Sequence, residues 1–140
     1  MFELNADPRV LQWTGDLPFH TLSAAEAFVQ SYDHFNVHGF GRWLVFRKQD
    51  GACLGWCGLR RGLHGVDFGL RWFYRYWNQG YGLQAGKAVL NWADEVPVGT
   101  LHAQHHPQNI YSKALLLRLG FTSTPPYPGS DSGWETYMRV

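Results

Sequence analysis

The sequence has little cysteine, little charge and no long hydrophobic run. Of its 140 residues, two are cysteine and 16% are charged. No apolar stretch approaches the roughly 18 residues that a membrane-spanning helix needs. The first residues, Met1 to Asn5, lack the basic and apolar regions of a secretion signal. We therefore expect a soluble protein in the cytoplasm.

The near balance of charge excludes further classes of protein. Lys and Arg number 12 and Asp and Glu 11, for a net charge of +1. This balance argues against a disordered tail and against a nucleic-acid binder that works by phosphate neutralisation. The length fits one domain over residues 1–140, and the high aromatic content of 16% can supply much of its core.

The two cysteines, Cys53 and Cys57, do not have the spacing of a redox or zinc motif. On a strand, residues four apart lie about 13 Å from each other, which is too far for a disulfide. We expect free thiols that are at least partly buried.

Local patterns predict a mixed α/β sheet. Asp7-Pro8 starts a short helix to about Trp13, and Ser23-Ala-Ala-Glu26 matches a capping box for a helix to about Asp33. The later predicted strands are 42–47, 53–59, 66–73, 100–105 and 134–140, with helices over about 83–96 and from Asn109 to Gly120. The first three of these strands read as an antiparallel meander, and the alternation that follows indicates an α/β fold.

A glycine turn lies between the third predicted strand and its helix, at Gln79-Gly-Tyr-Gly-Leu-Gln-Ala85. Glycines let the backbone curl around a ligand, and a helix N-terminus offers free N–H groups that suit a pyrophosphate. The alternative is a turn that only starts a helix. The segment also fits the dinucleotide fingerprint, but about half the chain precedes it, and the next acids, Asp94 and Glu95, lie on the same predicted helix.

Two ordered motifs lie in the second half of the chain. The first runs from Asp67-Phe-Gly-Leu through Tyr76-Trp-Asn-Gln-Gly-Tyr-Gly82 to Ala85. The second is Asn109-x-x-Ser112 followed by Leu116-x-x-x-Gly-Phe121. Together they resemble the GNAT superfamily of acetyl-CoA-dependent N-acetyltransferases, and within it the RimJ/RimL branch. The resemblance covers about residues 3–140 and implies a mostly antiparallel central sheet with helices on both faces and a splayed strand pair that holds the coenzyme.

The sequence departs from the branch at several positions. Asn78 replaces a glycine, Gln84 replaces a glutamate, and Tyr74 replaces a proline. The strand that usually precedes the Asp-Pro helix is missing or very short. We expect the bare edge near 43–47 to be covered by the segment from Leu4 to Trp13 or by a second subunit in a homodimer.

The resemblance implies direct transfer of the acetyl group from acetyl-CoA to a primary amine, on a protein N-terminus or a small molecule. The strand near Trp72 and Phe73 would pair with the pantetheine arm, an N–H near Trp72 would bind the oxyanion, and Asn109 would fix the arm or serve only as a helix cap. The implied coenzyme-binding residues are Trp72, Phe73, Trp77, Asn78, Gln79, Gly80, Tyr81, Gly82, Asn109 and Ser112.

The resemblance also suggests catalytic residues. Many family members protonate the leaving thiolate with a tyrosine where this chain has Leu116, so Ser112 is the candidate that contacts the sulfur, unless it is an ordinary helix residue. Asp67 is the candidate base, with His64 and Glu135 as rivals. An acid on a half-exposed strand is also often only solvated or salt-bridged.

We expect no metal, because His102, His105 and His106 have no local cysteine or carboxylate beside them. The cations that could meet the 3′-phosphate of the coenzyme are Arg75, Lys87, Lys113 and Arg118. Two other functions remain open, a non-catalytic module that binds or senses acetyl-CoA and a structural domain without coenzyme. We expect neither nucleic acid nor membrane as a partner.

Overall fold

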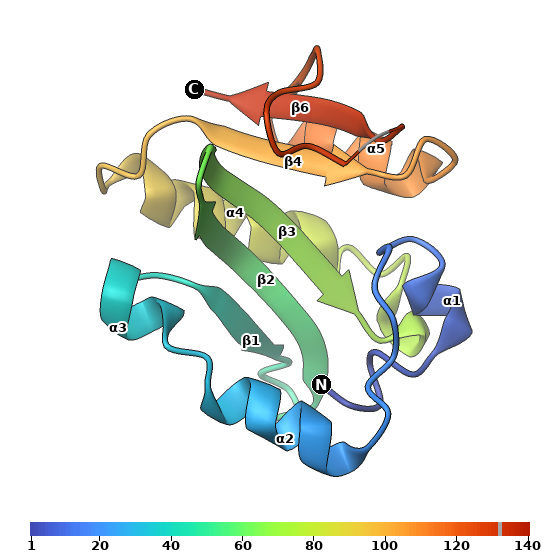
Figure 1. Cartoon of the computed structure of the whole chain (residues 1–140). Coiled ribbons are helices and arrows are strands. Elements are labelled where there is room, and N and C mark those ends of the chain that lie inside the picture. Colours follow the sequence, from blue (N-terminus) through green and yellow to red (C-terminus); the bar gives the residue numbers. More distant parts are fainter. Residues whose placement is uncertain (132) are drawn as a thin grey trace.

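One mixed sheet organises the chain in the computed structural model, which describes residues 1–131 and 133–140 (Figure 1). Its strand order is β1-β2-β3-β4-β6-β5, and only the β3–β4 pair is parallel. The strands are β1 (Arg42–Phe46), β2 (Cys53–Gly62), β3 (Gly65–Trp72), β4 (Leu101–His105), β5 (Thr122–Thr124) and β6 (Glu135–Arg139). The predicted α/β fold and its antiparallel meander β1-β2-β3 are confirmed.

Helices lie against both sides of this sheet. The longer helices α4 (Tyr81–Asp94) and α5 (Ile110–Arg118) lie behind it in Figure 1, while α2 (Leu22–Gln30) lies below the lower ends of β1 and β2. The core lies between the sheet and α4 with α5, where Leu59, Val66 and Phe121 are almost completely buried. The predicted free thiols are also confirmed, with Cys57 buried and Cys53 partly buried.

The first helix begins where the sequence pattern predicts, and the second does not. Asp7 does cap α1 (Pro8–Leu11) by accepting from Arg9 N–H. The predicted cap at Ser23 is wrong, because α2 starts at Leu22 and its capping side chain is Thr21, which accepts from Ala24 N–H. Thr21 is also a favourable capping residue and lies two positions earlier, so local preference does not fix the start of the helix.

Three short segments were not predicted from the sequence. The helix α3 (His34–His38) ends at Gly39, which has the left-handed φ of 76° that suits a C-terminal glycine. The 3₁₀ turn η1 (Tyr74–Tyr76) follows β3, and β5 pairs with β6. Each is at most five residues long, which is too short to give a clear periodic pattern.

The parallel strands β3 and β4 separate soon after they begin. Their ladder contains only the pairs Val66 with Leu101 and Asp67 with His102. From Phe68 onward β3 keeps its antiparallel partner β2 but is no longer paired with β4. This is the splayed strand pair that the resemblance implies.

The N-terminal segment does not cover the free edge of β1. Residues 2–6 form turns rather than a strand, and Asn5 Oδ1 accepts a hydrogen bond of 2.6 Å from Arg71 on β3. The expectation that residues Leu4 to Trp13 cover β1 is therefore wrong. On β1, Leu44 and Phe46 remain 61% and 55% exposed.

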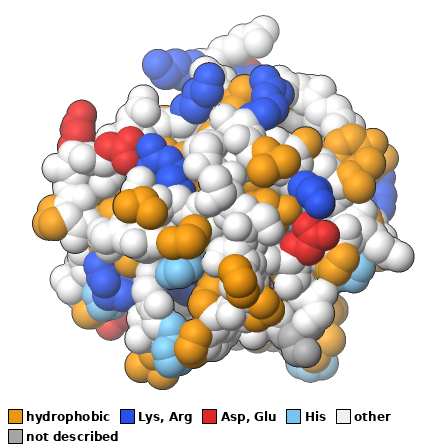
Figure 2. All heavy atoms as spheres, turned by 90° about the horizontal axis from the view of Figure 1, so that it is seen from above, with side chains coloured by type: hydrophobic (Ala, Val, Ile, Leu, Met, Phe, Trp, Pro, Cys, Tyr) orange, Lys and Arg blue, Asp and Glu red, His pale blue; other side chains and the backbone are white. Residues whose placement is uncertain are grey.

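The surface mixes apolar and charged side chains. On the face seen from above, hydrophobic groups are interspersed with Lys, Arg, Asp and Glu (Figure 2). Among the described residues, no helix has the length and hydrophobicity of a membrane span.

Candidate functional site

The turn before α4 has the backbone that an anion site needs. Gly80 is the N-cap of α4 with a left-handed φ of 83°, and Asn78 also has a positive φ of 58°. The first-turn N–H groups of Tyr81, Gly82 and Leu83 have no carbonyl four residues earlier within the helix. The partial positive charge at this helix end adds to their attraction for an anion.

Two arginines lie beside this turn. Arg47 donates to the hydroxyl of Tyr81 at 3.3 Å, and its guanidinium lies 5.4 Å from the ring centre of Tyr76. The guanidinium of Arg75 lies over the rings of Phe73 and Tyr76. Arg47 was missed from the sequence because it lies far from the glycine turn along the chain, and only the β1–β2 hairpin brings it close.

The other predicted phosphate-binding cations lie elsewhere or on exposed surfaces. Lys113 on α5 is 3.3 Å from Glu135, and Lys87 and Arg118 are exposed on α4 and α5. Among the described residues, Arg75 is therefore the one of these four predicted cations that contacts residues beside the α4 turn.

The end of β3 offers backbone groups toward the gap between β3 and β4. Phe73 N–H donates to Leu54 on β2 at 3.0 Å, so this N–H is not available for a pantetheine arm. Backbone groups alternate in direction along a strand, and Trp72 N–H therefore points away from β2, toward β4. The Trp72 carbonyl accepts from the indole of Trp77 at 3.0 Å.

The start of α5, which follows β4 in the chain, lies on the β4 side of the same gap. Asn109 Oδ1 accepts from Ser112 N–H at 3.1 Å, so Asn109 caps this helix as predicted. Helical spacing puts Ser112 on the same side as Leu115 and Leu116. Leu115 lies against Gly82, because a Cβ added at Gly82 would be 3.1 Å from it, and Leu116 is buried in the core.

Asp67 is tied to a buried arginine. Its carboxylate forms a short ion pair with Arg42, whose side chain is 15% exposed. Arg42 also donates to Gly58 O, and burial lowers the pKa of its guanidinium while Asp67 opposes that shift. The predicted candidate base is thus one half of a structural ion pair that joins β1 to β3.

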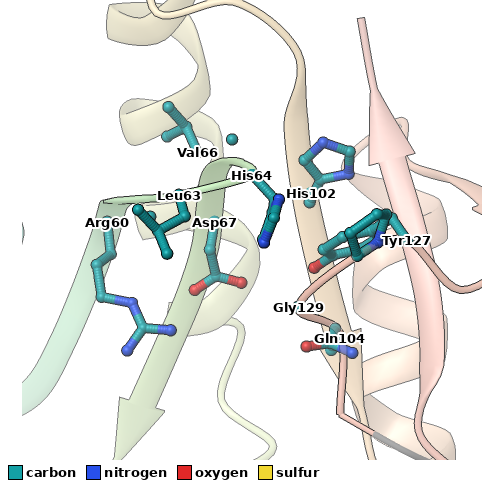
Figure 3. A pocket seen from close by; sticks show the side chains of 12 residues that line it. Arg60, Leu63, His64, Val66, Asp67, His102, Gln104, Tyr127 and Gly129 are labelled. Atoms are coloured by element: carbon teal, nitrogen blue, oxygen red, sulfur yellow. The ribbon is translucent and has the colours of Figure 1, made fainter.

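A cavity of about 100 Å³ opens beside Asp67 (Figure 3). It lies between the β2–β3 hairpin and the loop that precedes β6, near the closed end of the β3–β4 gap. The residues that line it include Arg60, His64, Asp67, His102, Gln104 and Tyr127. Burial and the charges of Asp67 and Asp131 raise the pKa of Tyr127 to about 12, so its hydroxyl stays protonated at neutral pH.

The remaining candidate groups point in different directions. Glu135 accepts from Tyr137 at 2.9 Å, and this bond together with Lys113 lowers the pKa of its carboxyl. His105 packs against Tyr137, His106 lies between Trp13 and Trp134, and His102 packs against Tyr127. Over residues 1–131 and 133–140, no three His, Cys, Asp or Glu side chains gather as a metal site would require.

The geometry fits a coenzyme with a pyrophosphate and an amide-containing arm. The left-handed turn with free N–H groups suits the pyrophosphate, and the unpaired edge of β3 suits the peptide-like arm. Trp72 Nε1 is buried without a hydrogen-bond partner and lies 3.3 Å from where a Cβ at Gly82 would be. These features converge where the splayed strands meet the start of α4.

Comparison with known proteins identifies the family. The model of the acetyltransferase (GNAT) domain matches residues 1–122. The chain belongs to this family, whose members use acetyl-CoA, and it is an acyltransferase. No curated protein matches the chain.

Solved structures with this fold include several acetyltransferases. An acetyltransferase from Agrobacterium tumefaciens is 26% identical with a TM-score of 0.82, covering 99% of this chain and 81% of that one. Spermidine N-acetyltransferase from Vibrio cholerae, in complex with CoA and spermine, is 12% identical with a TM-score of 0.77, covering 98% and 84%. Ribosomal-protein-alanine N-acetyltransferase from Brucella melitensis is 20% identical with a TM-score of 0.65, covering 82% and 77%.

Proposed function

We propose that the protein transfers the acetyl group of acetyl-CoA to a primary amine, either a protein N-terminus or a small molecule, by direct attack in a ternary complex. The observation that carries this proposal is the separation of β3 from β4 directly beside the free N–H groups of α4. The gap between the strands can hold a thioester arm, and the N–H groups of α4 can bind the diphosphate to which that arm is joined.

Each part of the coenzyme has candidate contacts in this chain. The turn from Trp77 to Gly82 would hold the pyrophosphate, with Arg47 and Arg75 nearby as counter-charges. Trp72 N–H, which points toward the gap, would bind the thioester oxygen as charge develops on it. Asn109 would hold the pantetheine arm through its free amide NH₂, and Ser112 would contact the sulfur.

Acetyl-CoA binding is tested by two glycine substitutions that impose the same conformational strain on the backbone. Gly80 and Gly99 share a φ of +83°, and a Cβ at either position meets nothing within 4 Å. Gly80→Glu would place a carboxylate at the proposed pyrophosphate site, whereas Gly99→Glu lies beyond the far end of α4. We expect saturating acetyl-CoA to raise the melting temperature of the wild type and Gly99→Glu but not of Gly80→Glu.

Turnover is measured as release of free CoA with a panel of small amines and peptides, and the acetylated product is identified by mass spectrometry. Tight acetyl-CoA binding without turnover on the whole panel would instead favour the second candidate, a non-catalytic binding or sensing module. That alternative is motivated by Leu116, which stands where many family members have a tyrosine.

Two finer proposals concern relatives and assembly. The motif around Trp77 and Ser112 favours a RimJ/RimL-like acetyltransferase, and we retain a cytoplasmic location as a prediction. The uncovered edge of β1, with Leu44 and Phe46 exposed, favours coverage by a second subunit. A monomer at high concentration in light scattering would contradict this homodimer.

A further inference from the structure

The cavity in Figure 3 adjoins the point at which β3 and β4 separate. Asp67 and His102 form the last paired residues of the two strands, and both line the cavity. A thioester seated in the gap beyond this pair would therefore lie next to the cavity. With about 100 Å³, the cavity has room for a small polar group such as an amine and its first substituents.

Asp67 is poorly suited to accept a proton there. One of its carboxylate oxygens is bound to Arg42, and that arginine reaches Asp67 across the backbone at Gly69. The mostly buried guanidinium depends on this carboxylate as its counter-charge, and separating the two is costly. The ion pair therefore holds the Asp67 carboxylate in place at the cavity wall.

His102 is the neighbouring group with a free ring. Its Nδ1 is buried and has no hydrogen-bond partner, and its Nε2 edge faces Gly65. A Cβ at Gly65 would be 3.1 Å from Nε2, so a glycine here avoids covering this edge of the ring, and both Gly65 and His102 line the cavity. Tyr127 packs against the ring with 4.3 Å between centroids and an angle of 38° between the ring planes.

Several charged or titratable groups line the same cavity as His102. They are Asp67 on β3, Arg60 on β2, His64 in the β2–β3 hairpin, and Tyr127 in the loop before β6, with Asp131 acting on Tyr127. Asp67 is the nearest along the strand pairing and would stabilise positive charge that develops on the imidazole.

We propose that this cavity receives the acceptor amine and that Nε2 of His102 accepts the proton of its ammonium group. This rests on the proposed function. The neutral amine then attacks the thioester carbonyl, so a C–N bond forms and the C–S bond breaks. The nitrogen loses a second proton, which the departing thiolate takes up, and the proton on His102 passes to solvent. Asp67 positions the ammonium at the cavity wall.

The test compares His102→Ala with His20→Ala, because His20 is an exposed histidine in the loop before α2 and does not line the cavity. The acceptors are the amine and peptide panel that identifies turnover. We expect His102→Ala to lose about 100-fold in kcat/KM, the range that general-base catalysis contributes. Its acetyl-CoA-induced rise in melting temperature should be unchanged, and His20→Ala should stay within a few-fold of wild type.

Chemical rescue separates a proton acceptor from a structural residue. Free imidazole can occupy the space left by the ring, so it should restore much of the activity of His102→Ala and have no effect on the wild type. A His102→Ala variant that keeps its activity, or loses activity that imidazole does not restore, overturns the proposal while wild-type turnover still supports the acetyltransferase. Absence of wild-type turnover on the panel overturns both.

Discussion

At the scale of single residues, Asn78 shows how a departure from the family pattern can keep the same backbone. The RimJ/RimL pattern has glycine at this position, and the structure gives Asn78 a left-handed φ of 58°. Asparagine is one of the few non-glycine residues that visit this region routinely. The turn that precedes α4 is thus preserved although the glycine is absent.

Substitution at Asn78 should therefore depend on backbone preference. Asn78→Gly should leave the stability unchanged or slightly raised, whereas Asn78→Val should lower the free energy of unfolding by about 1–2 kcal/mol, the cost of a left-handed conformation for a branched residue. Urea unfolding measures both. Equal stability of the glycine and valine variants would contradict a left-handed residue here.

The two thiols should differ in reactivity. Burial raises the pKa of Cys57 to about 12 and leaves none of its surface exposed, whereas Cys53 is partly exposed. Because the thiolate is the reactive form, a maleimide should label Cys53 in the folded protein and Cys57 only after unfolding. Peptide mapping by mass spectrometry identifies the labelled residue, and rapid native labelling of Cys57 would count against the structure.

At the scale of elements, a glycine sets the distance between α4 and α5. A Cβ added at Gly86 would lie 2.7 Å from a methyl carbon of Leu119, so the two helices approach closely at this point. Gly82, one turn earlier, is in similar contact with Leu115. The position of α5, and with it Asn109 and Ser112, depends on these small residues of α4.

Gly86→Val should consequently cost about 1–3 kcal/mol of stability through overpacking. Ala88→Val on the exposed side of the same helix is the matched control, and helix propensity limits its cost to below about 1 kcal/mol. Chemical denaturation compares the two. If both variants lose the same amount, close packing of α4 on α5 is not the cause.

Sequence patterns located the long elements but not the charge pairs between them. The caps at Asp7 and Asn109 and the alternation along the meander are local, and local propensities predicted them. The cap at Thr21 and the short helix α3 were missed because competing residues lie within a few positions of each other. The contacts of Arg47 and Arg42 were not predicted, because their partners Tyr81 and Asp67 lie 34 and 25 positions away in the sequence.

At the scale of the whole molecule, several exposed carboxylates are stabilised in their charged form. Hydrogen bonds from Arg47 hold the pKa of Asp50 at about 2, and those from Arg9, Arg139 and Tyr137 lower the pKa values of Asp7, Asp94 and Glu135. Because the folded values lie below the unfolded ones, these groups stabilise the fold above about pH 4. That contribution is lost as the pH falls through the folded values.

The melting temperature should thus decrease between about pH 4 and pH 2, and the decrease should be smaller at high salt, because these pairs are exposed and screened. Differential scanning calorimetry over this range at low and high ionic strength measures the effect. A melting temperature that does not change across this pH range would contradict it.

The sequence by itself determined the fold class, the free thiols and the glycine turn before α4, because short-range periodicity, spacing and backbone preference encode them. Only the tertiary structure decided that β3 and β4 separate after two residue pairs and that Arg42 forms an ion pair with Asp67. It also decided that His102 lines the same cavity as Asp67. These features arise from contacts between residues far apart in the chain, whose pairing no local pattern specifies. The candidate base therefore moves from Asp67 to His102 once the partners of each side chain are known.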